Sequence, residues 1–188
     1  RLRRALPTLK FLKEAGAKTI IISHIGREPE ETLLPVFEEL KNSIPMKWGG
    51  VITDPAFAEI KAEMQNGEIV FCENLRKDVR EEENDQDLVD SMAKYGDIYV
   101  NDAFAEAHRD HASTLGLAQV LPAYAGITLA EEVTELQKVM QPHHPSLFLL
   151  GGSKFETKMP LVEKYLKLYD HVFVGGALAN DVLKARGL

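Results

Sequence analysis

The sequence predicts an α/β protein whose mostly parallel sheet is covered by helices on both faces. Two observations predict this fold class. Short runs rich in Ile, Val, Phe and Tyr alternate with amphipathic helical patterns along most of the chain. One further helical pattern, residues 129–141, has prolines on both sides and separates a long first part from a short second part. We therefore expect two domains.

Five short apolar runs have the composition of buried parallel strands: residues 18–23, 68–72, 97–101, 146–150 and 171–174. Helical patterns lie between the early runs. Apolar positions in residues 6–12, 34–40 and 88–93 recur at the spacing of one helix face, the first pattern ending at Gly16 and the last before Gly96. Strands and helices that alternate in this way need crossover connections, which are typical of a parallel sheet.

The predicted domain boundaries follow from the proline-flanked pattern. Residues 1–126 are expected to form the first domain, residues 127–142 a linker helix, and residues 143–188 the start of a second domain. The last segment has room for two strands and a helix but not for an independent core. We therefore expect the second domain to be truncated and the chain to be a piece of a longer one.

The charge balance restricts the classes of partner. The chain has 22 Lys and Arg residues and 29 Asp and Glu residues, which gives a formal net charge of −7. This is the wrong sign for a protein whose whole surface binds nucleic acid or anionic lipid. Any site for an anion must therefore be local. No apolar run approaches the ~20 residues that span a bilayer. Cys72 is the single cysteine, which excludes an intrachain disulfide and favours a reducing, cytoplasmic location.

Three arginines follow three predicted strands. Arg27, Arg76 and Arg109 come shortly after the runs that end at residues 23, 72 and 101, with His24 and His108 beside them. Loops at the carboxyl ends of parallel strands form the ligand crevice of open sheets, so we expect these side chains in one crevice. Guanidinium groups pair with phosphate or carboxylate, which predicts a pocket for a small anionic metabolite. Three arginines in separate solvated loops remain the alternative.

A glycine-rich turn follows the fourth predicted strand. Gly151 and Gly152 would let the chain turn tightly into a helix, whose free amide groups favour an anion. Lys154 and Lys158 are four residues apart, on one face of that helix. An anion such as a phosphate chain would relieve the repulsion between them. The spacing is not that of a Walker motif, and a solvated helix start remains the alternative.

Other patterns are weaker. Residues 108–110 read His-Arg-Asp, but the Asn and the Asp-Phe-Gly of protein kinases do not follow. His108 and His111 have a metal-like spacing without the rest of a zinc motif, so we predict no metal site on the protein. Cys72 fits a buried apolar position better than a nucleophile. Asn101 and Asp102 either orient the arginines or cap the following turn.

Taken together and in order, these segments resemble the phosphoglycerate kinase family, from the first residue to the last. The motifs that carry the resemblance are Leu6-Pro7-Thr8-Leu9-Lys10, Gly16-Ala17-Lys18, Ser23-His24-Ile25-Gly26-Arg27, Glu73-Asn74-Leu75-Arg76, the run Gly96 to Phe104, Ala107 to Ser113, Gly151-Gly152-Ser153-Lys154 and Gly175-Gly176-Ala177. Each motif alone is common, but the ordered set is specific. The resemblance implies a Rossmann-like three-layer fold in a two-domain, hinge-bending kinase.

The resemblance also implies roles for individual residues. The patch that holds phosphoglycerate would consist of Arg1, His24, Arg27, Arg76, His108 and Arg109. Arg1 and Lys154 would be catalytic, close to the transferred phosphoryl group. The nucleotide side would include Gly151, Gly152, Lys154 and Lys158.

The implied reaction is a reversible phosphoryl transfer between 1,3-bisphosphoglycerate and ADP, which gives 3-phosphoglycerate and ATP in glycolysis, with Mg²⁺ bound to the nucleotide. We expect a cytoplasmic monomer with neither nucleic acid nor membrane as partner, and we expect this chain by itself to be inactive. A non-enzymatic module that binds an anionic phosphometabolite is the alternative. A second glycine-rich loop after this segment and an Asp-x-Asn strand before it, in the parent gene, would favour the enzyme over the non-enzymatic module.

The chain departs from the family pattern at several positions. Glu28 follows Arg27 where proline is usual, Ala105-Glu106 stands where Gly-Thr is usual, and Lys77 replaces an aromatic residue. Residues 155–157 also differ. These changes bear on substrate affinity and loop geometry more than on the class of reaction.

Overall fold

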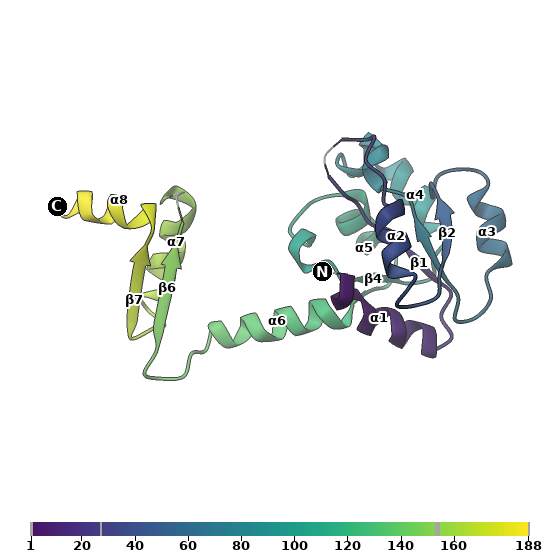
Figure 1. The fold of residues 1–188 in the computed structure, drawn as a ribbon. Helices are drawn as coiled ribbons and strands as arrows, with labels where there is room; N and C mark the ends of the chain where they lie inside the picture. The colour runs from purple at the N-terminus through teal and green to yellow at the C-terminus, as the bar shows by residue number, and fades with distance from the viewer. Residues whose placement is uncertain (1, 27, 153–154, 188) are drawn as a thin grey trace. The chain divides into compact units, whose positions relative to one another are not determined.

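The computed structural model describes residues 2–26, 28–152 and 155–187, without the side chains of residues 155–158. The chain divides into two compact units, Arg1–Glu132 and Val133–Leu188. The boundary lies within helix α6 (Ile127–Val139), the helix predicted at residues 129–141 (Figure 1). Its role as an interdomain linker stays a prediction. In the described part of the chain, no helix is long and apolar enough to cross a membrane.

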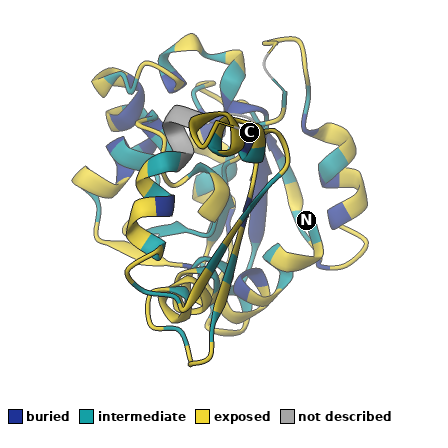
Figure 2. Cartoon of the chain, turned by 90° about the vertical axis from the view of Figure 1, so that its left-hand side faces the viewer, coloured by how far each residue is buried: buried dark blue, intermediate teal, exposed yellow. Residues whose placement is uncertain are grey.

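The centre of unit 1 is a three-stranded parallel sheet. Its strands are β1 (Thr19–Ile21), β2 (Lys47–Gly50) and β3 (Ile69–Cys72), in the order β1-β3-β2. All four residues of the central strand β3 are buried, and they are drawn dark blue in Figure 2. The sequence predicted β1 and β3 as strands. It did not indicate β2, whose Lys-Trp-Gly-Gly sequence has little β-branched character.

Helices cover both faces of this sheet because successive residues of β3 point to opposite sides. Ile69 and Phe71 pack in one apolar cluster with helices α1 (Leu2–Glu14) and α2 (Leu34–Leu40). Val70 and Cys72 pack in a second cluster with α3 (Phe57–Glu63) and α4 (Gln86–Ala93). The predicted three-layer α/β architecture is confirmed for this unit.

A second, two-stranded parallel ladder completes unit 1. Strand β4 (Tyr99–Asn101) pairs with β5 (Ala123–Ala125), apart from the three-stranded sheet. The sequence indicated β4 but showed only turn-like residues at β5. Between them, a π-helical turn (Ala112–Gly116) leads into the short helix α5 (Leu117–Val120). A Cβ atom at Gly116 would lie 2.3 Å from the Val89 side chain, so glycine is required for the close approach to α4.

Unit 2 is a βαβα segment. Strands β6 (Leu147–Gly151) and β7 (His171–Gly175) are parallel, with Leu147 opposite His171 and Gly151 opposite Gly175. Helices α7 (Phe155–Tyr165) and α8 (Ala177–Ala185) bury Leu150, Val162 and Leu178 against them. Both strands lie within one residue of their predicted positions.

The two faces of the unit 2 ladder differ. Phe148, Leu150 and Val174 pack towards α7 and α8. Leu147, Leu149 and Phe173 alternate with them and remain 57%, 67% and 60% exposed. In the described part of unit 2, both helices therefore pack on the same side of the ladder.

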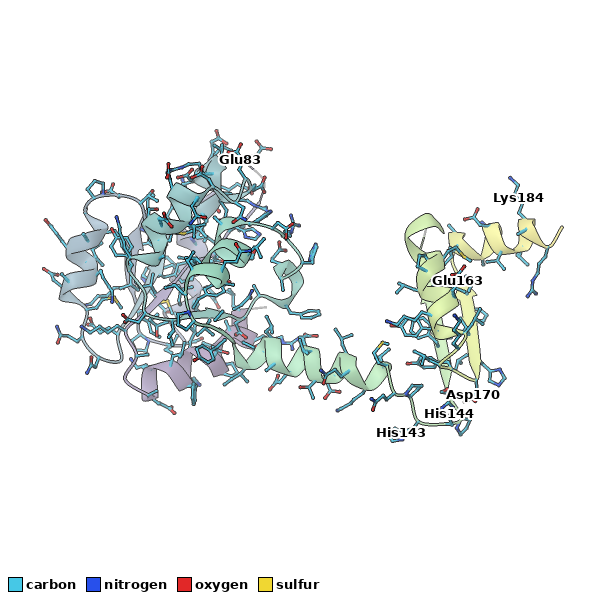
Figure 3. All side chains as sticks on the ribbon, turned by 180° about the vertical axis from the view of Figure 1, so that it is seen from behind. Glu83, His143, His144, Glu163, Asp170 and Lys184 are labelled. Atoms are coloured by element: carbon cyan, nitrogen blue, oxygen red, sulfur yellow. The ribbon has the colours of Figure 1, made fainter. Side chains whose placement is uncertain are left out.

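The carboxylate of Asp170 ties the starts of β6 and β7 together. Its Oδ2 atom accepts hydrogen bonds from the Ser146 amide (2.6 Å) and the Ser146 hydroxyl (3.0 Å), and it lies 2.8 Å from Nδ1 of His144. Figure 3 shows His144 beside Asp170. These contacts, with the His144 bond the largest, lower the pKa of Asp170 to about 2.

Glu81 is the one charged residue that unit 1 buries completely among its described residues. It ends a short 3-10 helix, Val79–Glu81, and accepts hydrogen bonds from the amide (3.0 Å) and hydroxyl of Ser113. Nδ1 of His111 lies 3.9 Å from its Oε1 atom. Burial raises the pKa of Glu81, although the Ser113 hydrogen bonds and His111 oppose the shift.

We predict that the Asp170 carboxyl group titrates near pH 2 and that Ser146→Ala raises this pKa, because the variant loses the hydroxyl donor. The native pKa lies below that of an unfolded chain. The Asp170 contribution to stability is therefore present above about pH 4 and is lost as the pH falls towards 2. A side-chain carboxyl titration by NMR measures this pKa, and an ordinary aspartate value would contradict the prediction.

We predict that wild-type protein loses stability as the pH rises and Glu81 ionises, and that Glu81→Gln does not show this loss. The native pKa is raised, so wild-type protein has its full stability below the ordinary glutamate range and loses part of it as the pH rises through the native value. Glutamine stays neutral and can still pair with Ser113. Glu81→Ala leaves the Ser113 amide without its acceptor and is expected to cost about 1 to 3 kcal/mol.

Urea unfolding followed through Trp48, the single tryptophan, measures both Glu81 variants in unit 1. Glu83 is an exposed residue of the same acidic segment, so Glu83→Gln controls for the change in net charge. Wild type and Glu81→Gln with parallel stability profiles between pH 4 and 8 would refute the role assigned to Glu81.

Candidate anion site

The carboxyl end of β3 is held to the loop after β1 by the side chain of Asn74. This buried carboxamide accepts hydrogen bonds from the amides of Ile25 and Arg76, both at 3.2 Å. It donates to the carbonyl oxygens of Ile25 (3.1 Å) and Glu31 (2.9 Å). These hydrogen bonds hold together two loops that are about fifty residues apart in sequence. They also fix the backbone of Arg76, because its amide is one of the donors.

Glu73 adds a second connection to the same loop. Its carboxylate accepts hydrogen bonds from the Leu33 amide (2.8 Å), the Asn74 amide (2.7 Å) and the Thr32 hydroxyl (2.7 Å). Partial burial alone would raise the pKa of Glu73, but these hydrogen bonds together lower it. Residues 32 and 33 are therefore held against the end of β3 by an ionised carboxylate.

Arg76 lies beneath the loop that follows β1. Its side chain is only 8% exposed, and its Nη1 atom donates to the carbonyl oxygen of Gly26. Its Nε atom lies 2.9 Å from Oε1 of Glu82. The guanidinium is therefore attached both to the backbone of the neighbouring loop and to a carboxylate of its own chain.

His24 and Arg109 share a carboxylate, that of Glu106. Oε2 of Glu106 lies 2.6 Å from Nε of Arg109 and 3.7 Å from Nε2 of His24. Burial lowers the pKa of His24, and the positive charge of Arg76 lowers it further, with smaller contributions from His111 and Arg109. Glu106 alone among these neighbours raises it. Arg76 and Arg109 thus both act on His24 electrostatically, while their convergence on one anion crevice stays a prediction.

The remaining residues of the predicted patch are placed differently. Arg1 and Arg27 lie outside the described residues. His108 is exposed and directly precedes Arg109 in the sequence. His111 belongs to the motif Ala107 to Ser113; its Nδ1 atom lies 3.9 Å from Oε1 of Glu81, and its charge helps to lower the pKa of His24. Its spacing along the chain carried no signal of this position, which depends on how the π-helical turn packs.

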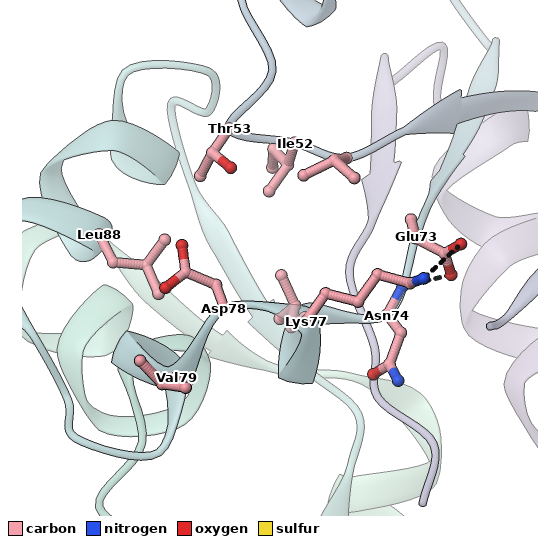
Figure 4. Close-up of a pocket in the computed structure, with 10 residues that line it drawn as sticks. Ile52, Thr53, Glu73, Asn74, Lys77, Asp78, Val79 and Leu88 are labelled. Carbon is pink, nitrogen blue, oxygen red and sulfur yellow. Dashed lines mark hydrogen bonds and ion pairs between the residues drawn. The ribbon is translucent and has the colours of Figure 1, made fainter. Parts of the chain in front are cut away.

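A pocket of about 270 Å³ adjoins this cluster at the carboxyl ends of β2 and β3 (Figure 4). Lys77 reaches across one side of it to Glu73, 3.7 Å away. The other lining residues are Val51, Ile52, Thr53, Asn74, Leu75, Asp78, Val79 and Leu88. It shares Asn74 and Leu75 with the loop that carries Arg76, but the basic cluster itself does not line it.

The carboxyl edge of unit 2 brings two glycine turns together. The amide of Leu178, in the first turn of α8, donates to the Gly152 carbonyl oxygen at 2.9 Å. Gly152 (φ 147°) and Gly176 (φ 64°) have backbone conformations that favour glycine. A Cβ atom at Gly151 would meet open space. Lys154 lies outside the described residues, as does the side chain of Lys158, so their predicted anion contact stays a prediction.

Three further residues have structural partners. Asn101 accepts from the Ala103 amide (2.9 Å) and Asp102 from the Leu129 amide (3.0 Å), so both cap turns, the second at the start of α6. Burial raises the pKa of Cys72 to about 12, which keeps this thiol protonated. Among the described side chains, no group of three or more His, Cys, Asp or Glu residues is arranged to hold a metal ion.

Comparison with known proteins gives a consistent result. A family model described as "Phosphoglycerate kinase" matches residues 1–188. The phosphoglycerate kinases of Roseiflexus castenholzii and Caulobacter vibrioides are 40% and 39% identical over 197 and 195 residues. The match covers 100% of this chain but only 50% and 49% of those proteins. The chain therefore spans about half the length of the curated relatives that it matches.

Solved structures agree. Phosphoglycerate kinase from Coxiella burnetii matches with a TM-score of 0.86 at 37% identity, and that from Pyrococcus horikoshii with a TM-score of 0.86 at 31% identity. Each comparison covers the whole of this chain and about half of the other, 49% and 50%. The motifs at the carboxyl ends of β1, β3, β4 and β6 thus have one explanation: the chain belongs to the phosphoglycerate kinase family.

Proposed function

We propose that this chain carries the phosphoglycerate-binding part and the first nucleotide-binding elements of a phosphoglycerate kinase. The reaction is the reversible transfer of a phosphoryl group between 1,3-bisphosphoglycerate and ADP. Family membership supports this class of chemistry, a phosphotransferase reaction with a carboxyl group as acceptor. That this chain takes part in this particular reaction, with these substrates, is our proposal.

The observation that carries the proposal is the basic cluster of unit 1. His24 follows β1, Arg76 follows β3 and Arg109 follows β4, and the charges of both arginines act on His24. Such a cluster suits a small acid with a phosphate group, because guanidinium groups pair with phosphate oxygens through several N–H groups. We propose that Arg27 and His108 extend the cluster and that Arg1 lies next to the transferred group.

Phosphoryl transfer needs little covalent chemistry from a protein, so positioning and charge stabilisation dominate. We propose that Arg1 and Lys154 neutralise charge on the transferred group. The glycine turns at residues 151–152 and 175–176 would let the nucleotide phosphates approach the backbone, with Lys158 beside them. Mg²⁺ would arrive with the nucleotide, as part of the substrate.

We predict that 3-phosphoglycerate binds weakly to the 188-residue chain and that the affinity falls from 0.05 to 0.5 M salt, because the attraction at an open site is screened. Arg109→Gln should weaken binding by roughly 10- to 100-fold, the loss typical of a charge-assisted hydrogen bond. Calorimetric titration measures both effects. Lys184 is an exposed residue of α8 in unit 2 (Figure 3), so Lys184→Gln is the control with the same charge change.

If neither salt nor Arg109→Gln changes the affinity for 3-phosphoglycerate, the ligand binds at another site. NMR chemical-shift changes at the amides of residues 24–26 and 74–76 add the location. Changes confined to unit 2 would contradict the assignment of the phosphoglycerate site.

We predict that the 188-residue chain, assayed by itself, forms no ATP from 1,3-bisphosphoglycerate and ADP. Donor and acceptor must be held in line, and the described part of unit 2 offers two strands and two helices to the nucleotide. A coupled assay beside the Roseiflexus castenholzii enzyme decides the matter. Turnover comparable to that enzyme would show that the chain already contains a complete catalytic site.

A further inference from the structure

Each basic side chain of the cluster has a carboxylate neighbour. Arg76 pairs with Glu82, and Arg109 and His24 share Glu106. These two carboxylates are not equivalent. The Glu82 side chain is 55% exposed and meets the edge of a guanidinium that Gly26 also holds. The Glu106 side chain is 27% exposed and lies between two members of the cluster.

The position of Glu106 follows from its backbone. It ends the 3-10 helix Phe104–Glu106, where its amide donates to the Ala103 carbonyl oxygen at 3.0 Å. The Arg109 amide then donates to the Glu106 carbonyl oxygen at 3.0 Å. This turn brings the two side chains together, three residues apart, and aims the Glu106 carboxylate at His24, which comes from the loop after β1.

The Oε2 atom of Glu106 has close basic neighbours but lacks, within the described part of the chain, the hydrogen bonds that a buried oxygen usually has. It is buried, yet among the described residues it has no hydrogen bond of regular geometry. Its neighbours are the Nε atom of Arg109 at 2.6 Å and the imidazole of His24 at 3.7 Å. Buried carboxylate oxygens normally accept regular hydrogen bonds, so this oxygen is held mainly by the charge of the Arg109 guanidinium.

We propose that Glu106 is a resident anion of the phosphate site, which competes with the substrate for Arg109 and His24 and so lowers the affinity for phosphoglycerate. The inference rests on the proposed function, because it assumes that the cluster takes the phosphorylated acid. It adds a residue that determines affinity. In this role Glu106 acts before substrate arrives and must leave its position when the phosphate binds.

Electrostatics gives the direction of the effect. A phosphate group bound to the Arg109 guanidinium would lie next to the Glu106 carboxylate, which contacts the same guanidinium. The two negative charges would repel each other. Binding therefore includes the cost of separating Glu106 from Arg109 and His24. A purely structural role predicts the opposite outcome, since loss of a stabilising contact in the 104–109 turn would disorder Arg109 and weaken binding.

The test compares Glu106→Gln with wild type in calorimetric titrations with 3-phosphoglycerate at 0.05 M salt. We expect binding to tighten by about tenfold, the factor that corresponds to the removal of about 1.4 kcal/mol of repulsion. Glu106→Thr should act in the same direction, which guards against an effect peculiar to glutamine. Glu83→Gln has the same change in net charge at an exposed position of unit 1 (Figure 3) and should bind as wild type does.

A second measurement reports on the geometry without any ligand. The Glu106 carboxylate raises the pKa of His24 against the effect of burial and Arg76. An NMR titration of His24 should therefore give a lower pKa in Glu106→Gln than in wild type, and an unchanged pKa in Glu83→Gln. Urea unfolding followed through Trp48 establishes that each variant is folded.

The outcomes separate the two proposals. If folded Glu106→Gln and Glu106→Thr bind 3-phosphoglycerate no more tightly than wild type, Glu106 is not a competing anion, and the proposed function stands. An unchanged His24 pKa in Glu106→Gln would equally overturn the inference. If wild type and both variants all fail to bind, the proposed function fails, and this inference fails with it.

Discussion

The carboxamide of Asn74 is the interaction on which the rest of the candidate site depends. It makes four hydrogen bonds, to the amide and carbonyl of Ile25, the carbonyl of Glu31 and the amide of Arg76. Such a buried group is costly to leave unpaired, so the loops after β1 and β3 have one mutual arrangement that satisfies it. Arg76 and the loop that carries His24 take their positions from that arrangement.

A frame of neutral hydrogen bonds allows cations to gather without support from a ligand, but the cations still repel one another. The chain relieves this repulsion with its own carboxylates, Glu82 at Arg76 and Glu106 at Arg109 and His24. Glu81 has a related position beside His111, although its burial is compensated mainly by Ser113. The cluster is therefore partly neutralised before any substrate arrives. This agrees with a chain of net charge −7 that nevertheless has a local site for an anion.

The two units reach order by different means. Unit 1 has an apolar cluster on each face of its sheet, with β3 buried between them. The described side chains of unit 2 form one small cluster, around Leu150, Val162 and Leu178, and Asp170 adds hydrogen bonds to Ser146. Its other face exposes Leu149 and Phe173, large apolar side chains that burial would stabilise by about 1.5 to 3 kcal/mol each. We therefore expect unit 2 to be less stable than unit 1 when each is taken by itself.

The sequence by itself determined the α/β class, the family and five of the seven strands found among the described residues. These depend on local composition and on the order of motifs along the chain. The sequence also placed His24, Arg76 and Arg109 at strand ends. Only the tertiary structure decided that β2 and β5 are strands, since Lys-Trp-Gly-Gly and Ala-Tyr-Ala become extended through pairing with partners twenty or more residues away. The position of His111 and the pairing of Glu82 with Arg76 were decided there too. An ion pair depends on distance in space, and many acidic residues of this chain are equally plausible partners for one arginine until the loops are folded against each other.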